Sequence, residues 1–114
     1  MQNILDHFKD PDNYGELSNY THVYELKNLS CGDSIKVFLL VENDKVSKVS
    51  FLGSGCAISQ AAMSILSSEI TAMTLDELRK LDSAYIKQLL GIKLGPTRLK
   101  CAILGLESIR KALQ

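Results

Sequence analysis

At Phe51-Leu52-Gly53-Ser54-Gly55-Cys56-Ala57-Ile58 the periodicity of the sequence changes, and this change decides the fold. Before this stretch, apolar residues recur at every second position, which is typical of a half-buried strand. After it they recur every three to four positions, which is typical of a helix. We therefore predict a strand that runs through two glycines and places Cys56 at the start of a helix. The first-turn N–H groups and the helix dipole favour a thiolate at that position.

Upstream of this stretch the sequence predicts one short helix followed by three strands. Residues 2–9 carry apolar residues at helical spacing, and the turn-forming residues 10–15 end that helix. Residues 23–26 form the first expected strand, which could begin as early as Tyr20. Residues 34–52 alternate between apolar and polar on both sides of a turn at 42–45, which predicts an antiparallel hairpin. The three strands then form a meander.

Downstream, the sequence predicts four helices. The first runs from Cys56 to about residue 72, and Thr74 with Glu77 forms a capping box that starts the second. Ser83 is placed to cap the third, and Pro96 suits the first turn of a last helix that continues unbroken to the end of the sequence. The predicted fold is α+β, a three-stranded antiparallel sheet with helices packed on one face. The apolar stripe of the first of these helices is Ile58, Ala62, Ile65, Leu66 and Ile70.

Composition limits the class of protein and of partner. The 114 residues suffice for a single domain, 1–114, with a core of its own. Thirteen basic and thirteen acidic residues cancel, which argues against nucleic acid or an anionic membrane as the main partner. No apolar run approaches the roughly 18 residues of a membrane span. An odd number of cysteines and no recognisable leader favour a cytoplasmic protein with reduced thiols.

The cysteines Cys31, Cys56 and Cys101 avoid the positions where periodicity would place a packing residue. Cys101 lies roughly 130° from the centre of the apolar stripe of the last helix, and Cys56 lies similarly off its own stripe. Cys31 is in a loop, and Asp33 follows two residues later on the same side of an extended chain. If these segments meet, three thiolates and one carboxylate form a four-ligand set for zinc or for one edge of an iron–sulfur cluster.

Other interpretations of these residues stay open. A buried cysteine is often only a small hydrophobic residue. His7 or His22 could pair with a cysteine nucleophile, although we expect both histidines to be structural. Gly53 and Gly55 do not complete a phosphate-binding pattern, because Ile58 occupies the position of the third glycine.

Four segments of the sequence carry a family resemblance. They are Ile4-Leu5-Asp6-His7-Phe8-Lys9-Asp10-Pro11-Asp12-Asn13-Tyr14-Gly15, Cys31-Gly32-Asp33, Gly55-Cys56-Ala57-Ile58-Ser59 and Arg98-Leu99-Lys100-Cys101. The first resembles the N-terminal helix and Asn-Pro-x-Asn-x-Gly turn of the IscU/SufU/NifU N-terminal family of iron–sulfur cluster assembly scaffolds, with Asp10 in place of the first Asn. The other three match the ligand segments of that family in order and approximate separation.

The resemblance implies a site and a set of partners. Cys31, Cys56 and Cys101 would bind a [2Fe-2S] cluster, or zinc at the same site, with Asp33 as a further ligand or as the residue that keeps the cluster labile. A cysteine desulfurase would supply the sulfur, with Cys31 and Cys101 as candidate persulfide acceptors. Apo iron–sulfur proteins would receive the finished cluster.

Two departures from the family pattern leave the activity open. Lys100 stands where IscU members often carry His, as in SufU members, yet the extra segment of SufU members between the second and third cysteines is missing. Residues 94–98 read Leu94-Gly95-Pro96-Thr97-Arg98 instead of Leu-Pro-Pro-Val-Lys, which argues against binding of an Hsp70-type chaperone. The resemblance favours a scaffold over an enzyme, with a SufU-like zinc-dependent sulfurtransferase as the alternative and a structural zinc domain as a third reading.

Overall fold

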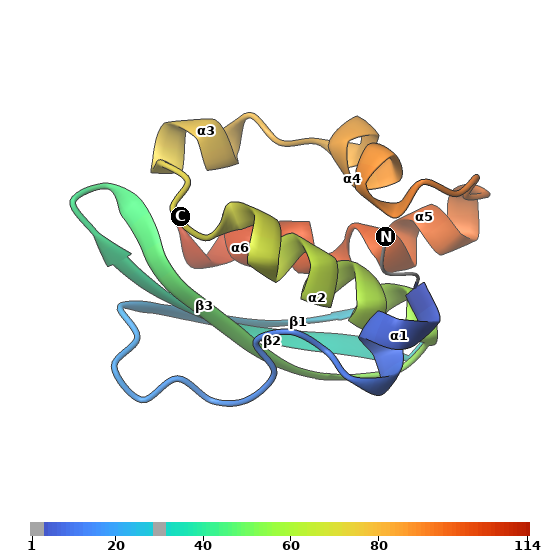
Figure 1. Cartoon of the computed structure of the whole chain (residues 1–114), viewed down its shortest axis with the longest axis horizontal. Coiled ribbons are helices and arrows are strands. Elements are labelled where there is room, and N and C mark those ends of the chain that lie inside the picture. The colour runs from blue at the N-terminus through green and yellow to red at the C-terminus, as the bar shows by residue number, and fades with distance from the viewer. Residues whose placement is uncertain (1–3, 29–31) are drawn as a thin grey trace.

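The alternating residues form a three-stranded antiparallel meander in the order β1-β2-β3 (Figure 1). β1 spans His22–Asn28, β2 spans Asp33–Glu42 and β3 spans Lys45–Ser54 in this computed structural model, which describes residues 4–28 and 32–114. The turn between β2 and β3 is formed by Asn43 and Asp44, whose φ angles are 54° and 61°. A tight hairpin needs positive φ at both central positions, and Asn and Asp tolerate that conformation. The predicted hairpin is therefore confirmed.

Three β2 residues, Ile35, Val37 and Leu39, are fully buried and face the helices. Phe38 points to the opposite face of the sheet and is also buried, although the alternation predicts an exposed position. The ring of Tyr20, from the segment before β1, lies 5.6 Å from the ring of Phe38 and covers it. The far face of the sheet therefore carries a small apolar cluster of its own.

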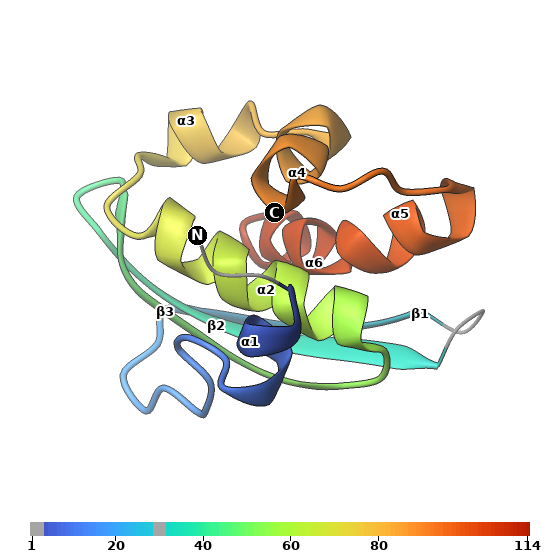
Figure 2. The same cartoon turned by 45° about the vertical axis from the view of Figure 1, so that its right-hand side comes forward.

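The helices cover one face of the sheet, as predicted (Figure 1 and Figure 2). α2 and α6 lie directly on the sheet, α1 lies beside α2, and α3 and α4 form a layer further out. The described helices are α1 Ile4–Lys9, α2 Ala57–Ile70, α3 Leu75–Arg79, α4 Ser83–Leu90, α5 Pro96–Ala102 and α6 Leu104–Ala112. Among these described helices, none is long and apolar enough to cross a membrane.

Two predictions about helix ends are wrong. Ser83 is the first residue of α4 and not its cap, because the Asp82 carboxylate takes that role by accepting the Tyr85 N–H at 3.1 Å. The last helix is not continuous: it breaks at Ile103 into α5 and α6. Both pieces contact α2, and α6 also packs on β1 and β2. Pro96 does occupy the first turn of α5, as predicted.

The buried surface of α2 is wider than the predicted stripe. Ile58 and Ile65 are only partly buried, whereas the serines at 64 and 67 are fully buried. These serines are covered by α1 and the turn after it: His7 Nδ1 lies 2.7 Å from Ser64 Oγ, and the Asn13 side-chain amide donates to Ser67 Oγ at 2.9 Å. His7 is therefore a structural residue that holds α1 against α2.

Candidate metal centre

Three of the four predicted site residues come together at one end of the sheet. Asp33 is the first residue of β2, Cys56 directly precedes α2, and Cys101 lies in α5. One ligand atom from each, a carboxylate oxygen and two Sγ atoms, lies within 4.8 Å of the others. Cys31, the fourth predicted ligand, lies outside the described residues. The end of the sheet where β2 begins and the N-terminus of α2 thus form one mixed oxygen and sulfur site.

Asp33 and Cys56 contact each other through two separate atom pairs. The Cys56 backbone N–H donates to Asp33 Oδ1 at 2.7 Å, and the Cys56 Sγ lies 3.4 Å from Asp33 Oδ2 as a thiol donor. Cys56 is the N-cap of α2 and, in the described part of the chain, its own side chain caps no helix N–H. Asp33 thus binds the first N–H of this helix start with one oxygen and faces the thiol with the other.

Gly55 makes the approach of Asp33 sterically feasible. Its φ is +122°, and a Cβ at this position would overlap the Asp33 side chain and backbone. Gly53 is restricted in a similar way, because a Cβ there would overlap the Gln60 side chain and the Ser34 carbonyl oxygen. Gly53 and Gly55 are therefore required for close packing against the start of β2.

A buried polar network that the sequence analysis missed lies beneath Cys56. Ser59 Oγ donates to the Cys56 carbonyl oxygen at 3.1 Å and lies 3.8 Å from its Sγ. Gln60 Nε2 donates to Ser59 Oγ and to the Ser54 carbonyl oxygen, both at 3.0 Å. Both side chains are buried. The only available signal is their position three and four residues after Cys56, which places them on the same helix face as the cysteine.

Cys101 is more buried than the sequence analysis implies, with 4% of its surface exposed. It is one of the buried hydrophobic residues although it is not a member of the hydrophobic cluster formed by the described residues, so the prediction that it avoids a packing position holds for that cluster alone. Its surroundings are instead the start of β2 and the start of α2. Removing its sulfur therefore leaves a small buried gap as well as a missing ligand.

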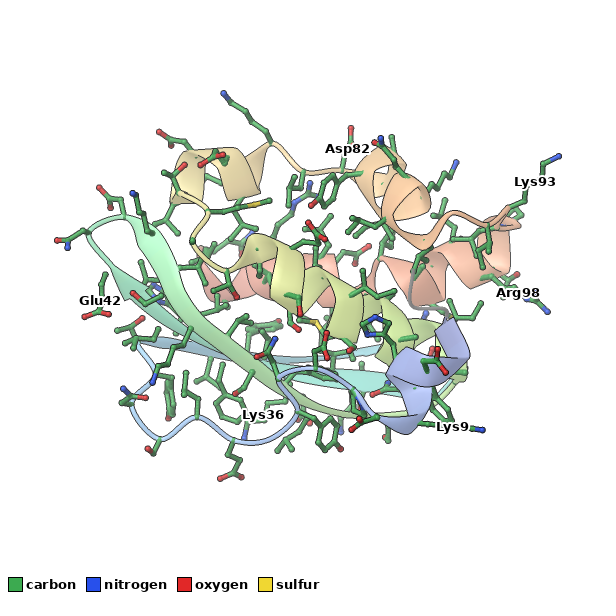
Figure 3. All side chains as sticks on the ribbon, in the orientation of Figure 1. Lys9, Lys36, Glu42, Asp82, Lys93 and Arg98 are labelled. Atoms are coloured by element: carbon green, nitrogen blue, oxygen red, sulfur yellow. The ribbon has the colours of Figure 1, made fainter. Side chains whose placement is uncertain are left out.

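Cationic side chains project from the same end of the molecule. Figure 3 shows Lys93 and Arg98 extending outward near α5, and Lys9 extending from α1 at the same end. Lys100, which precedes Cys101, is exposed. The end of the molecule that holds the candidate site therefore also carries exposed positive charge.

The donor set fits a zinc ion or an iron centre. Ligand atoms around tetrahedral zinc with thiolate bonds of about 2.3 Å lie about 3.8 Å apart, so the observed separations need only a small contraction. Thiolates suit zinc and iron–sulfur centres, whereas a single carboxylate among them is a harder and less tightly held ligand. The described residues supply three ligands, which leaves one coordination position for a further residue or an exchangeable group.

Comparison with known proteins identifies relatives over the full chain. Residues 1–114 match the NifU-like N terminal domain. The zinc-dependent sulfurtransferase SufU of Bacillus subtilis is 31% identical, with 98% of this chain and 87% of SufU covered. The iron–sulfur cluster assembly scaffold protein IscU of Thermotoga maritima is 33% identical, with 97% and 89% covered.

A solved structure supports the same relationship. The structure of SufU from Fervidobacterium islandicum, assigned as an iron–sulfur cluster assembly scaffold protein of the SUF system, superposes with a TM-score of 0.82 at 31% identity. The superposition covers 97% of this chain and 93% of that one. The similarity therefore extends over all the elements that build the candidate site.

Proposed function

Because the chain belongs to the NifU-like N-terminal domain family, we propose that it is a scaffold on which an iron–sulfur cluster is assembled and then passed to acceptor proteins. One observation carries this proposal: Asp33, Cys56 and Cys101, from three separate elements, meet within 4.8 Å at a partly exposed helix start. Structural zinc sites are normally closed by cysteine and histidine ligands. A carboxylate among thiolates is a harder and less tightly held ligand, so a site that includes Asp33 is better suited to a cargo that must leave.

The proposed ligands of a [2Fe-2S] cargo are Cys31, Asp33, Cys56 and Cys101. Asp33 begins β2, so Cys31 precedes it by only two residues and is close to the site along the chain. We place the whole activity in one domain, residues 1–114. Three reduced thiols are needed, which favours the cytoplasm as the compartment.

Sulfur delivery requires a thiolate on this chain and a persulfide on a cysteine desulfurase. The thiolate of Cys31 or Cys101 attacks the terminal sulfur of the donor persulfide, the S–S bond of the donor breaks and a new S–S bond forms on this chain. The donor cysteine leaves as a thiolate, so the exchange needs no oxidant.

Reconstitution with iron and sulfide under anaerobic conditions tests the scaffold proposal. We expect a cluster with visible absorption that transfers to an apo-ferredoxin, and we expect Cys101→Ala to form no stable cluster. A chain that forms no cluster, or a cluster that never transfers, would contradict the proposal.

Asp33 controls how long the cluster stays. A carboxylate holds iron less firmly than a thiolate in this kind of site. We expect Asp33→Ala to lengthen the cluster lifetime severalfold when loss to a chelator is followed by absorbance. The structure adds a control, because Asp33 also accepts the Cys56 backbone N–H: Asp33→Asn keeps an acceptor for that N–H and separates loss of this hydrogen bond from loss of the charge. Faster cluster loss in Asp33→Ala would contradict this role.

A zinc-dependent sulfurtransferase is the second candidate function, favoured by the similarity to SufU and by Lys100 before the third cysteine. Bound zinc would hold the thiolates in the deprotonated form until a partner displaces one of them. Colourless protein that binds zinc tightly and accelerates a cysteine desulfurase would favour this function. A desulfurase rate that does not respond to Cys31→Ala would favour a purely structural zinc site.

A further inference from the structure

The two edges of the sheet differ in how they are covered. The outer edge of β3 is bonded at both ends: near the metal centre Gly15 N–H donates to the Phe51 carbonyl at 2.8 Å, and at the other end Val46 N–H donates to the Met73 carbonyl at 2.9 Å. Within residues 4–28 and 32–114, the backbone of residues 23–27 in β1 hydrogen-bonds to other backbone groups only in β2. β1 is therefore an open edge.

β1 presents side chains that suit pairing with another strand. Val23 is 37% exposed and Tyr24 is 36% exposed, although both are large apolar residues in a strand. Glu25 and Lys27 are also exposed, and the strand contains no proline. An open, exposed edge of this kind is a template for a further strand unless charge repels it. The charges of β1 therefore decide what can pair with it.

The charges on β1 are complementary to a second copy of the same strand in one register. In a symmetric antiparallel pair, a register centred on Leu26 places Glu25 of one copy opposite Lys27 of the other, and does so twice. A register centred on Glu25 places two glutamates opposite each other, and a register centred on Lys27 places two lysines opposite each other. Opposite charges on facing residues stabilise a strand pair and like charges destabilise it. The Leu26 register is the one that the sequence favours.

The same register brings a side chain of the second copy to the groove beside the metal centre. This groove, of about 470 Å³, is lined by Leu26, Lys27, Asn28, Lys100, Leu104 and Glu107. In the Leu26 register, Tyr24 of the second copy lies opposite Asn28. Tyr24 pairs with Val37 of β2, and Asn28 pairs with Asp33. Val37 faces the helices and paired residues share a face of the sheet, so Tyr24 lies on the helix-covered face. The groove lies on that same face, and Tyr24 of the second copy therefore reaches it without crossing the sheet.

We propose that β1 is a dimerisation strand, through which two copies of this chain form a continuous six-stranded sheet centred on Leu26. Tyr24 of each copy occupies the groove of the other, next to the strand end that carries the metal centre. The dimer is reversible, because it rests on one strand pair and two side chains. It does not depend on the proposed function, since neither iron nor sulfide takes part in the contact.

Sedimentation equilibrium of the full chain, reduced and metal-free, tests the proposal. We expect a concentration-dependent equilibrium between monomer and dimer. Glu25→Lys and Lys27→Glu each convert two attractive pairs into two repulsive pairs, so we expect each to weaken dimerisation roughly tenfold or more. An equimolar mixture of these two variants restores opposite charges across the contact and should dimerise about as strongly as the unmodified chain. Glu42→Lys, the same charge change at the far end of the β2–β3 hairpin, serves as the matched control and should leave dimerisation unchanged.

Tyr24 provides a second and independent measurement. We expect Tyr24→Ala to weaken dimerisation several-fold and Tyr24→Phe to retain most of it, because the ring fills the groove. A chain that is monomeric at every concentration, or a variant mixture that does not recover, would overturn the proposal; recovery itself shows that both variants are folded. Normal dimerisation of Tyr24→Ala would overturn the placement of Tyr24 in the groove.

Discussion

The starts of α2 and α3 show two different ways of completing a helix N-terminus. At α3 the cap is local: Thr74 Oγ1 accepts the Glu77 N–H and Glu77 Oε1 accepts the Thr74 N–H, both at 3.1 Å. At α2 the residue in the cap position is Cys56, and its N–H is bound by Asp33, which lies 23 residues earlier at the start of β2. One helix start is self-contained, and the other depends on the tertiary fold.

The start of α3 contributes to stability, whereas the start of α2 also carries a side chain that can bind a metal. The side chains of Thr74 and Glu77 are engaged in the capping box. Among the described residues, the side chain of Cys56 caps no N–H of α2 and stays available for metal binding, while the carboxylate of Asp33 accepts the backbone N–H of Cys56. Changes at α3 should therefore alter only stability, whereas changes at α2 should alter metal binding as well.

Loss of a cysteine thiol should have the largest effect on zinc affinity and should distinguish the starts of α2 and α3 most clearly. We expect Cys56→Ala and Cys101→Ala each to lower zinc affinity on the order of a hundredfold or more, because loss of an outer-shell partner alone costs about tenfold to a hundredfold. Circular dichroism should show a retained fold, with Cys101→Ala less stable by about 1 kcal/mol because its sulfur is buried. Competition with a chromophoric chelator measures the affinity. Unchanged zinc affinity in either variant would remove that cysteine from the site.

The next largest effect is expected from substitution of Gly55, with Gly91 as the matched control. Gly55 and Gly91 both have positive φ, +122° and +66°, but only at Gly55 does a Cβ overlap another residue; at Gly91 no described atom lies within 4 Å of it. We expect Gly91→Ala to cost about 1 kcal/mol of folding free energy from backbone conformation alone. Gly55→Ala adds displacement of Asp33, so we expect roughly 3 kcal/mol together with weaker zinc binding. Urea denaturation and zinc competition measure the two effects, and equal losses in the two variants would show that Asp33 is not held by this contact.

Removal of the local cap should have a smaller effect that is confined to stability. We expect Thr74→Ala to cost about 1 kcal/mol, because the Glu77 N–H and the Glu77 carboxylate both lose their partner hydroxyl. Zinc affinity should stay unchanged, since α3 lies in the outer layer of helices. A parallel loss of zinc affinity would show that the two helix starts are coupled.

The smallest expected effect is a pH dependence at α3. The hydrogen bond from the Thr74 backbone N–H, followed by the one from its hydroxyl, lowers the pKa of Glu77 below its ordinary value of 4.5. Stability from a carboxyl with a lowered pKa is fully present above that ordinary value and is lost as the pH falls through the lowered one. We therefore expect Glu77→Gln to be less stable than the unmodified chain at neutral pH, with the difference shrinking below pH 4.5. Denaturation at several pH values measures it, and a difference that grows on acidification would contradict it.

Local signals predicted most of the fold. The hairpin turn, the capping box at Thr74 and Pro96 in the first turn of α5 depend on neighbouring residues, and each is found as expected. The break at Ile103 was not predicted, because the apolar stripe continues through it. Gly105 lies two residues beyond the break, where a Cβ would overlap the Met63 side chain of α2, so the close approach of α6 to α2 depends on tertiary packing that periodicity does not show.

The sequence predicted three residues that meet at the candidate site, Asp33, Cys56 and Cys101, but not the contacts that hold them in place. Helix periodicity placed Cys56 and Cys101 off the core stripes, and two-residue spacing related Asp33 to Cys31. The double contact between Asp33 and Cys56 and the buried Ser59 and Gln60 depend on which surfaces cover α2. That information lies in the packing of segments distant in sequence, so periodicity alone could not show it.

The two carboxylate oxygens of Asp33 make different contacts, and this difference affects the empty form of a carrier protein. Oδ1 accepts the backbone N–H of Cys56, the residue before α2, while Oδ2 is the oxygen directed toward the thiol. Departure of a bound cargo therefore leaves the Cys56 N–H paired. In a delivery protein built in this way, one contact of the loading site persists between one round of loading and the next.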